Sequence, residues 1–244
     1  MKILFDVGNT RIKAASYDKG VLTVLPSCSN RDREFPLAWS AGNKPSSIFV
    51  ASVAAGEVLS ALAAWAQKHW GIAIAEVAVR QDVGDMRTAY EKPSQLGVDR
   101  WLAALGAYHL AGKKGVCVID AGTALTVDVV DQHGLHHGGL IAPGLNLMIE
   151  SLTRGTAQLE LENISVPDIF ANNTESAISL GCADYVAGMV NRVATRIETS
   201  NLKIDSWFIT GGQGELVASL CSMPMELVPD LVLRGMIAAT ESEQ

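Results

Sequence analysis

Asp6-Val7-Gly8-Asn9-Thr10 is the stretch that decides the fold, and it follows directly on the apolar run Ile3-Leu4-Phe5. An apolar strand therefore ends in a carboxylate, a glycine and small polar residues. A glycine at a strand tip lets backbone N–H groups approach an anion closely, and a neighbouring carboxylate suits the Mg²⁺ that accompanies a nucleotide. The same Asp-x-Gly-Asn pattern is also ordinary chemistry for a hairpin turn. The stretch by itself leaves both interpretations open.

The same pattern occurs again later in the chain. Residues 116–120 form a second apolar run, and Asp120-Ala121-Gly122-Thr123 follows it. A shift of 114 residues (120 − 6), without a gap, aligns Asp6 with Asp120, Gly8 with Gly122, and Gly20 with Gly134. We interpret this as an internal duplication. Two copies are too few for a solenoid, so the duplication predicts two similar domains that face each other, with a polar turn from each lining the cleft between them.

A third glycine turn follows another apolar run. Residues 207–210 are Trp-Phe-Ile-Thr, and Gly211-Gly212 comes directly after them and before a short helical pattern. Elsewhere short apolar runs alternate with helical periodicity, which is typical of an α/β layer fold. We therefore predict an α/β protein with an N-terminal domain at residues 1–113 and a C-terminal domain at 114–244, with the boundary in the segment Ala-Gly-Lys-Lys-Gly at 111–115.

Composition and charge exclude several classes of protein. The 244 residues are 48% hydrophobic and carry a formal net charge of −7, without a long Lys/Arg cluster, so nucleic acid is not an expected partner. The four cysteines lie far apart without a C-x-x-C pair, which argues against a metal site and a disulfide framework. No apolar run reaches membrane-spanning length, and no signal segment is recognisable. These features predict a cytoplasmic protein without a membrane partner.

The commonest nucleotide and hydrolase motifs are also missing. The sequence contains no Gly-x-x-x-x-Gly-Lys-[Ser/Thr] loop, no Gly-x-Gly-x-x-Gly after a strand and no Gly-x-Ser-x-Gly elbow. If the chain binds a nucleotide, the duplicated turns are therefore the expected place.

Gly97-Val98-Asp99-Arg100 closes an irregular loop and precedes a helical pattern from Trp101. Asp99 falls where a helix N-cap belongs, so one interpretation is a cap followed by a solvated first-turn arginine. An ionised aspartate at a helix start can also accept a hydroxyl proton, which is the role that the family resemblance given below implies for Asp99. The positive helix N-terminus favours the charged form of such an aspartate, and this predicts a low basicity.

These stretches together resemble a known family. The duplicated turns and the late Thr-Gly-Gly resemble the superfamily of acetate and sugar kinases, heat-shock 70 ATPases and actin, with duplicated actin-like (ribonuclease H-like) domains and the active site between them. More narrowly, the chain resembles type III pantothenate kinase from residue 3 to about residue 235. The stretches that carry this resemblance are Asp6-Val7-Gly8-Asn9-Thr10, Gly97-Val98-Asp99-Arg100, Asp120-Ala121-Gly122-Thr123-Ala124, Ile209-Thr210-Gly211-Gly212, Gly139-Leu140-Ile141-Ala142-Pro143-Gly144 and Asn173-Thr174-Glu175-Ser176-Ala177.

The resemblance implies a homodimeric kinase that uses ATP to phosphorylate pantothenate, the first step of coenzyme A biosynthesis, with pantothenate held at the dimer interface. It implies that Asp99 is the general base, that Asp6 faces Mg²⁺ through water, and that Asp120 holds a monovalent cation, K⁺ or NH₄⁺. The implied ATP-binding residues are Asp6, Val7, Gly8, Asn9, Thr10, Arg11, Ile12, Lys13, Thr123, Gly211 and Gly212. The implied pantothenate-binding residues are Tyr90, Gly97, Val98, Asp99, Arg100 and Thr174.

Arg100 separates the main alternatives. A guanidinium beside the base suits a substrate that carries a carboxylate, because the two groups form a bidentate pair. The first alternative is a kinase of the same fold acting on another small molecule, such as a sugar. The second is a non-enzymatic regulatory accessory factor, and the presence of Asp6, Asp99 and Asp120 together argues against a binding role alone.

Overall fold

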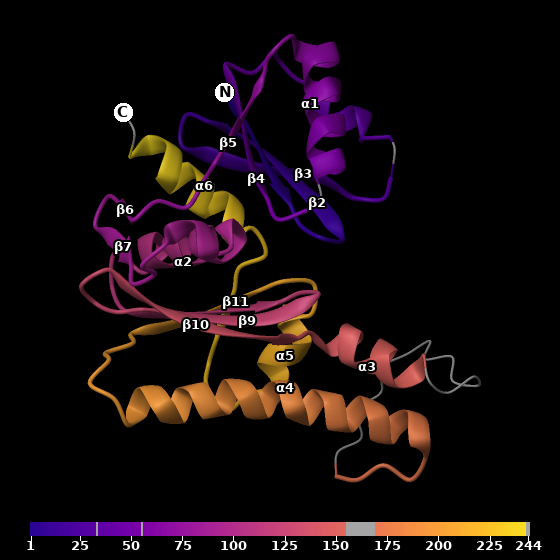
Figure 1. The fold of residues 1–244 in the computed structure, drawn as a ribbon, viewed down its shortest axis with the longest axis vertical. Helices are drawn as coiled ribbons and strands as arrows, with labels where there is room; N and C mark the ends of the chain where they lie inside the picture. Colours follow the sequence, from indigo (N-terminus) through magenta and orange to yellow (C-terminus); the bar gives the residue numbers. More distant parts are fainter. Residues whose placement is uncertain (33, 55, 155–168, 243–244) are drawn as a thin grey trace.

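The computed structural model describes residues 1–32, 34–54, 56–154 and 169–242 (Figure 1). The elements of the first part are β1 (Lys2–Val7), β2 (Arg11–Asp18), β3 (Val21–Ser29), the 3₁₀ turn η1 (Leu37–Ser40), β4 (Ser47–Ser52), α1 (Gly56–Trp70) and β5 (Ile74–Glu76). Next come β6 (Asp82–Val83), β7 (Met86–Thr88), the 3₁₀ turn η2 (Pro93–Gln95), α2 (Val98–Leu110), β8 (Val116–Ala121), β9 (Ala124–Val130), β10 (Leu135–Pro143) and α3 (Leu145–Thr153). The last are α4 (Thr174–Glu198), β11 (Ser206–Thr210), α5 (Gly214–Leu220), β12 (Glu226–Leu227) and α6 (Leu231–Glu241).

The two sheets repeat one topology, which confirms the duplication. The first sheet has the order β3-β2-β1-β4-β5, and the second contains the corresponding order β10-β9-β8-β11-β12. In each, the first three strands are antiparallel and the last two join in parallel. Shifting β1 and β3 by 114 residues gives 116–121 and 135–143, the bounds of β8 and β10. The offset of 114 residues that aligns the two halves of the sequence therefore also aligns their strands.

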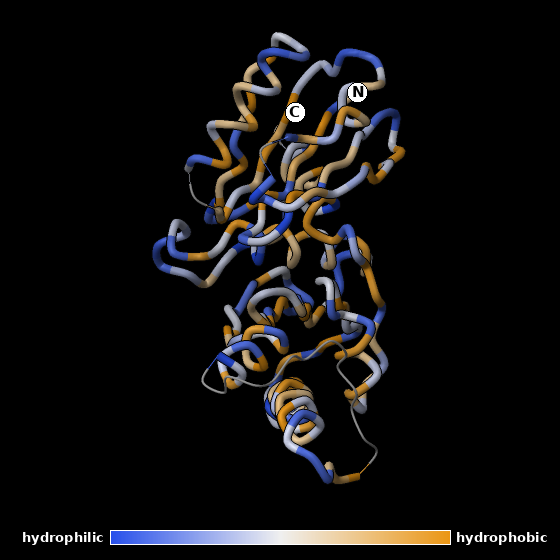
Figure 2. Tube along the Cα trace, turned by 90° about the vertical axis from the view of Figure 1, so that its right-hand side faces the viewer, coloured by the Kyte–Doolittle hydropathy of each residue, from blue (hydrophilic) through white to orange (hydrophobic). Residues whose placement is uncertain are grey.

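The elements stack in layers, with α2 and α6 between the two sheets (Figure 1). Buried residues of β1, β2, β4, β8, β9 and β11 share one core with these helices. A second core joins the first sheet to α1, and a third joins the other face of the second sheet to α3, α4 and α5. Hydrophobic stretches accordingly run through the strands and helices, and hydrophilic ones gather at the turns (Figure 2).

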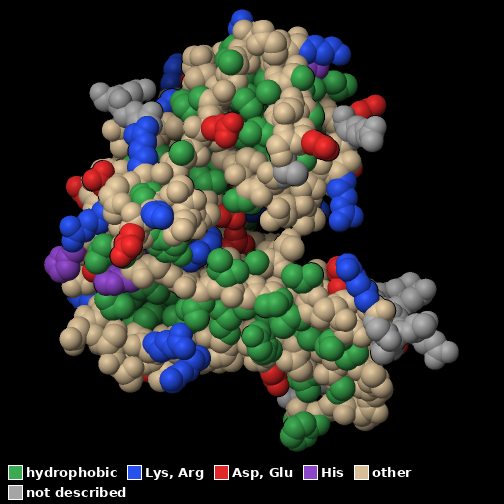
Figure 3. Space-filling model, viewed as in Figure 1, with side chains coloured by type: hydrophobic (Ala, Val, Ile, Leu, Met, Phe, Trp, Pro, Cys, Tyr) green, Lys and Arg blue, Asp and Glu red, His purple; other side chains and the backbone are tan. Residues whose placement is uncertain are grey.

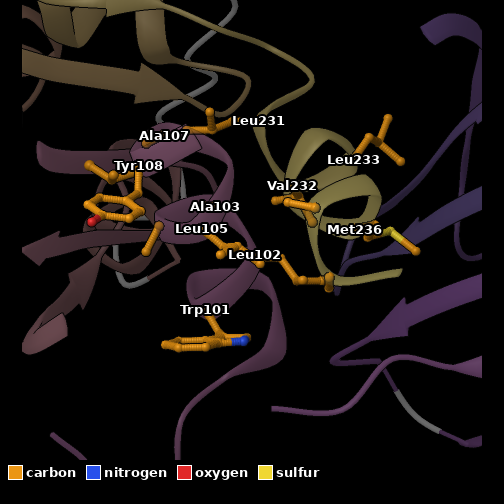
Figure 4. Packing of buried hydrophobic residues seen from close by; sticks show 14 of the residues in the cluster. Trp101, Leu102, Ala103, Leu105, Ala107, Tyr108, Leu231, Val232, Leu233 and Met236 are labelled. Atoms are coloured by element: carbon orange, nitrogen blue, oxygen red, sulfur yellow. The ribbon is translucent and has the colours of Figure 1, made fainter. Parts of the chain in front are cut away.

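The helices α2 and α6 cross with their backbones in contact. A Cβ added at Gly106 would lie 2.5 Å from the Leu231 carbonyl oxygen, and one at Gly235 would lie 1.9 Å from that of Leu102. Only glycine permits so close an approach. Leu102 and Val232 lie next to each other at this contact (Figure 4). The crossing fixes the start of α2, which carries Asp99, relative to the start of α6.

Sheet membership divides the chain earlier than residue 113. The short strands β6 and β7 precede the predicted boundary, yet they extend the second sheet beyond β10. The C-terminal helix α6 in turn contacts β1 and β2 of the first sheet. The boundary at 113/114 therefore does not coincide with the sheets, and as a division into domains it stays a prediction.

Among the described residues, no helix is long and apolar enough to cross a membrane.

Candidate active site

A cleft opens between the two sheets at the tips of the duplicated strands. Its volume is about 500 Å³. Figure 3 shows the molecule hollowed between its upper and lower halves, with acidic side chains at the inner end of the hollow. The lining includes residues of the two duplicated turns, of the Gly211-Gly212 turn and of the start of α2. The full set is Asp6, Gly8, Asn9, Thr10, Arg11, Lys13, Val53, Asp99, Asp120, Ala121, Gly122, Thr123, Ala124, Thr126, Asn146, Leu147, Glu150, Gly211, Gly212, Gln213 and Val232.

The two duplicated turns meet across this cleft. Asp6 and Asp120 lie near the ends of β1 and β8, on the face of each sheet that looks toward the other. In each turn the glycine N–H donates to a carbonyl further along the chain, Gly8 to that of Arg11 and Gly122 to that of Ala124. The hydroxyl oxygens of Thr10 and Thr123 are 2.9 Å apart. The cleft is thus closed at its base by polar turns whose backbone N–H groups suit an anion.

Burial changes the acidity of the two strand-end carboxyls. Removal from water raises the pKa of Asp6 from 3.8 to about 7, with smaller increases from the charges of Asp120 and Asp99. Burial likewise raises the pKa of Asp120 to about 6. Lys13 opposes both shifts, and its Nζ also donates to the Pro229 carbonyl at 3.1 Å. A cation bound beside these carboxyls would favour their ionised form.

The third turn lies directly against the second. Gly211 has a φ of +91°, and a Cβ there would lie 2.5 Å from both the Ala121 carbonyl and Asp120 Oδ1. Both the positive φ and the close contact with the second turn require a glycine at position 211. The neighbouring Thr210 pairs in register with Asp120. Thr210 Oγ1 is buried and has no hydrogen-bond partner among the described residues.

Asp99 enters the cleft from the first turn of α2. The N-cap of α2 is Gly97, so the interpretation of Asp99 as the cap is wrong. Asp99 Oδ1 accepts the backbone N–H of Arg100 at 2.8 Å. Burial raises the pKa of Asp99 above its usual value and outweighs the lowering by that hydrogen bond and by the Arg100 charge. The low basicity predicted from the helix N-terminus is therefore wrong in direction.

Arg100 is not a solvated residue, and its bidentate edge is already occupied. The side chain is buried, and its Nε and Nη2 donate to the two carboxylate oxygens of Asp128 at 2.9 and 2.6 Å. The predicted bidentate pairing with a substrate carboxylate is thus wrong as a geometry. Nη1 remains, and it donates to the Tyr90 hydroxyl at 3.3 Å.

The other predicted residues fall in two groups. Val7 and Ile12 are fully buried in the core of the first sheet and do not line the cleft, so the nucleotide contact predicted for them is not present there. Thr174, at the start of α4, lies in a separate groove of about 530 Å³ between α3 and α4. That groove is lined by Met148, Ser151, Leu152, Thr174, Ala177, Ile178, Gly181, Cys182 and Tyr185. Tyr90, Gly97, Val98 and Arg100 do not line the cleft either.

The site residues predicted from the sequence omitted one wall of the cleft. Asn146 and Glu150 lie on α3, and Gln213 Nε2 donates to Asn146 Oδ1 at 2.6 Å. The position of Gln213 directly after Gly211-Gly212 is a signal that could have found it. No local pattern marks Asn146 or Glu150, because α3 reaches the cleft only through the packing of the second sheet.

Comparisons with known proteins agree on one family. A family model described as type III pantothenate kinase matches residues 2–196. The chain is 38% identical to a type III pantothenate kinase from Azoarcus sp. (strain BH72), over 99% of this chain and 92% of that protein. It is 34% identical to the one from Nitrosococcus oceani, over 97% of this chain and 92% of that protein. The one from Hydrogenovibrio crunogenus is 34% identical, over 99% of this chain and 100% of that protein.

Solved structures show the same fold at lower identity. A conserved protein of Campylobacter jejuni, described as belonging to a Baf family of transcriptional activators, matches with a TM-score of 0.59 and 21% identity over 99% of this chain and 98% of that one. A ROK family glucokinase from Streptomyces griseus, solved with glucose and AMPPNP, matches with a TM-score of 0.51 and 14% identity over 100% and 99%. These likenesses establish the actin-like fold and no more.

Proposed function

This chain belongs to the type III pantothenate kinase family, and from that premise we propose that Asp99 is the general base of its reaction. The family transfers a phosphoryl group from ATP to pantothenate in coenzyme A biosynthesis. The observation that carries the proposal is the convergence of Asp6, Asp99 and Asp120 on one cleft lined by glycine turns. Such a transfer needs an in-line hydroxyl, neutralised phosphates and a proton acceptor, and little covalent work from the protein.

Asp99 suits the proton acceptor because burial raises its pKa. A carboxylate with a raised pKa is a stronger base than an exposed one. Its Oδ1 is held by the Arg100 backbone N–H, which leaves Oδ2 for the hydroxyl of pantothenate. Asp99 takes the hydroxyl proton while the pantothenate oxygen forms its bond to the γ-phosphorus and the bond from that phosphorus to ADP breaks.

ATP acts with Mg²⁺, which offsets phosphate charge when it is bound. Among the described residues there is no group of three or more His, Cys, Asp or Glu side chains that could hold a metal ion. This fits a metal that is carried mainly by phosphates and water, with one carboxylate, Asp6, facing it. We propose that the nucleotide binds among the predicted residues that line the cleft. These are Asp6, Gly8, Asn9, Thr10, Arg11, Lys13, Thr123, Gly211 and Gly212.

Asp120 is proposed to hold the monovalent cation, K⁺ or NH₄⁺. Two features support this role. Burial raises the pKa of Asp120, so a cation beside it would favour the ionised form. Thr210 Oγ1, buried and unpartnered within the described part of the chain, belongs to the residue paired with Asp120 across β8 and β11. A carboxylate and a hydroxyl oxygen are suitable ligands for K⁺.

The homodimer is also part of the proposal. Thr174 lies in the groove between α3 and α4, outside the cleft that contains Asp99. A second copy seated on this groove would bring its own surface to the pantothenate site, as the role implied for Thr174 requires. Phe170 and Tyr185 nearby are 88% and 56% exposed, which suits a covered interface. A monomer by light scattering at micromolar concentration would remove this part.

The four cysteines are free, and cytoplasmic localisation stays a prediction.

The direct test is ADP release with and without pantothenate, with K⁺ and Mg²⁺ present. We expect release that depends on pantothenate in the wild type and a loss of at least about a hundredfold in folded Asp99→Asn, because general-base catalysis contributes about that much. The control is Asp82→Asn, at an exposed carboxylate on β6, which should turn over as the wild type does. Wild-type turnover in pure Asp99→Asn would refute the base assignment. A panel of sugars and hydroxy acids in place of pantothenate tests the other acceptors.

A further inference from the structure

A buried group of charged side chains lies between α2 and the second sheet, behind the cleft. Arg100, Asp128 and His136 are 7%, 2% and 0% exposed, and we call them the Arg100 cluster. Asp128 accepts from Arg100 Nε and Nη2, and His136 Nε2 lies 2.8 Å from Asp128 Oδ1. Buried charges persist in proteins when they are paired and hydrogen-bonded, and this cluster meets both conditions. Asp128 and His136 have no role in the reaction described above.

Both ring nitrogens of His136 have hydrogen-bond partners. Asp128 Oδ1 accepts, so the proton of the ring is assigned to Nε2. On the other side, His136 Nδ1 lies 3.3 Å from Thr88 Oγ1. The same hydroxyl oxygen accepts the Tyr90 backbone N–H at 3.1 Å, which leaves its own proton for Nδ1. Asp128 is the counter-charge of Arg100, to which it is joined by two hydrogen bonds.

His136 contacts both Asp128, which holds Arg100, and the ring of Tyr90. Through Asp128 it fixes the orientation of the Arg100 guanidinium, so that Nη1 points at the Tyr90 hydroxyl. Through its ring it stacks on Tyr90, with centroids 6.1 Å apart and planes at 21°. It also contacts the Thr88 hydroxyl, whose oxygen accepts the Tyr90 backbone N–H. Both polar groups that the family resemblance assigns to pantothenate therefore depend on one buried imidazole.

We propose that His136 and Asp128 are positioning residues for pantothenate, acting through Arg100 and Tyr90. This rests on the proposed function, because it takes Arg100 and Tyr90 as the pantothenate contacts. Asp128 neutralises Arg100, so the substrate carboxylate is recognised by directed donors, Nη1 and the Tyr90 hydroxyl, rather than by net charge. Directed donors act only when their orientation is held, and the Arg100 cluster holds it.

The decisive variants are at His136, because Asp128→Asn would leave Arg100 buried without a counter-ion. An asparagine at 136 cannot place a donor where Nε2 lies, whereas a glutamine amide can. We expect folded His136→Asn to raise the pantothenate KM roughly tenfold, equivalent to about 1.4 kcal/mol, with the ATP KM and kcat within about twofold of the wild type. His136→Gln should recover most of the loss. If His136→Asn does not fold, Thr88→Val, which removes the hydroxyl at Nδ1, should raise the same KM about threefold.

The matched control is His137→Asn. His137 Nε2 lies 2.8 Å from Asp131 Oδ2 on the same hairpin, but this pair does not contact Arg100. Its kinetics should equal those of the wild type. Titration calorimetry of pantothenate without ATP makes the comparison independently of turnover. Wild-type affinity in folded His136→Asn overturns the proposal, as does a fall in kcat with KM unchanged or an equal loss in His137→Asn. An inactive wild type that still binds pantothenate would instead overturn the proposed function.

Discussion

Replacing Asp6 by asparagine tests whether burial of the Asp6 carboxylate in the cleft lowers the stability of the folded protein. The side chain of Asp6 is 9% exposed at the end of β1, and burial raises its pKa from 3.8 to about 7. A group whose pKa is raised by folding contributes stability below its unfolded pKa, and that contribution is lost as the pH rises through the folded value. Above pH 7 the Asp6 carboxylate of the ligand-free folded protein is therefore ionised while buried, and this is less favourable than ionisation in water.

The size of the effect follows from the two pKa values. A shift from 3.8 to about 7 corresponds to about 4 kcal/mol once the pH exceeds the folded pKa, at about 1.4 kcal/mol for each pKa unit. At pH 5 the unfolded chain is already ionised and the folded one is not, so about 2 kcal/mol of the penalty remains. Asparagine has nearly the shape of the protonated acid and cannot ionise. We expect Asp6→Asn to be more stable than the wild type by about 4 kcal/mol at pH 8 and by about 2 kcal/mol at pH 5.

The assay is urea unfolding without nucleotide or divalent metal at several pH values between 5 and 8. For a chain of this length, 4 kcal/mol corresponds to roughly 8–16 °C in a parallel thermal scan. Asp82→Asn is the control, and its stability difference from the wild type should not depend on pH. The variant should also lose turnover, because Asp6 is proposed to face the metal. A difference between Asp6→Asn and the wild type that is the same at pH 5 and pH 8 would refute the reasoning.

Two further predictions concern the same cleft. Gly97→Ala should lower kcat about tenfold in folded protein, since its Cβ would lie 2.6 Å from Asp99 Oδ1 and displace the base. The control is Gly188→Ala on α4, where a Cβ meets nothing within 4 Å, and it should leave kcat unchanged. Equal rates for the two variants would contradict this prediction. Replacing K⁺ or NH₄⁺ by Na⁺ at constant ionic strength should cut turnover sharply, whereas equal rates in all three salts would remove Asp120 from the cation role.

The sequence determined the duplication and the family. The repeat at a shift of 114 residues marks strand, turn and strand in register, because the residues that make a phosphate turn are local and their spacing is preserved. Most of the residues implied by the resemblance do line one cleft, since strand ends of the two sheets meet there.

Only the tertiary structure decided how the charged groups are used. Arg100 looked free for a substrate because Asp128 is 28 residues away in the sequence, yet packing of α2 on β9 brings the two into a bidentate pair. The basicity of Asp99 was misjudged because a helix start can be read from sequence whereas burial cannot. Hydrogen-bond partners and desolvation are properties of long-range contacts, and these exist only once the sheets and helices have packed together.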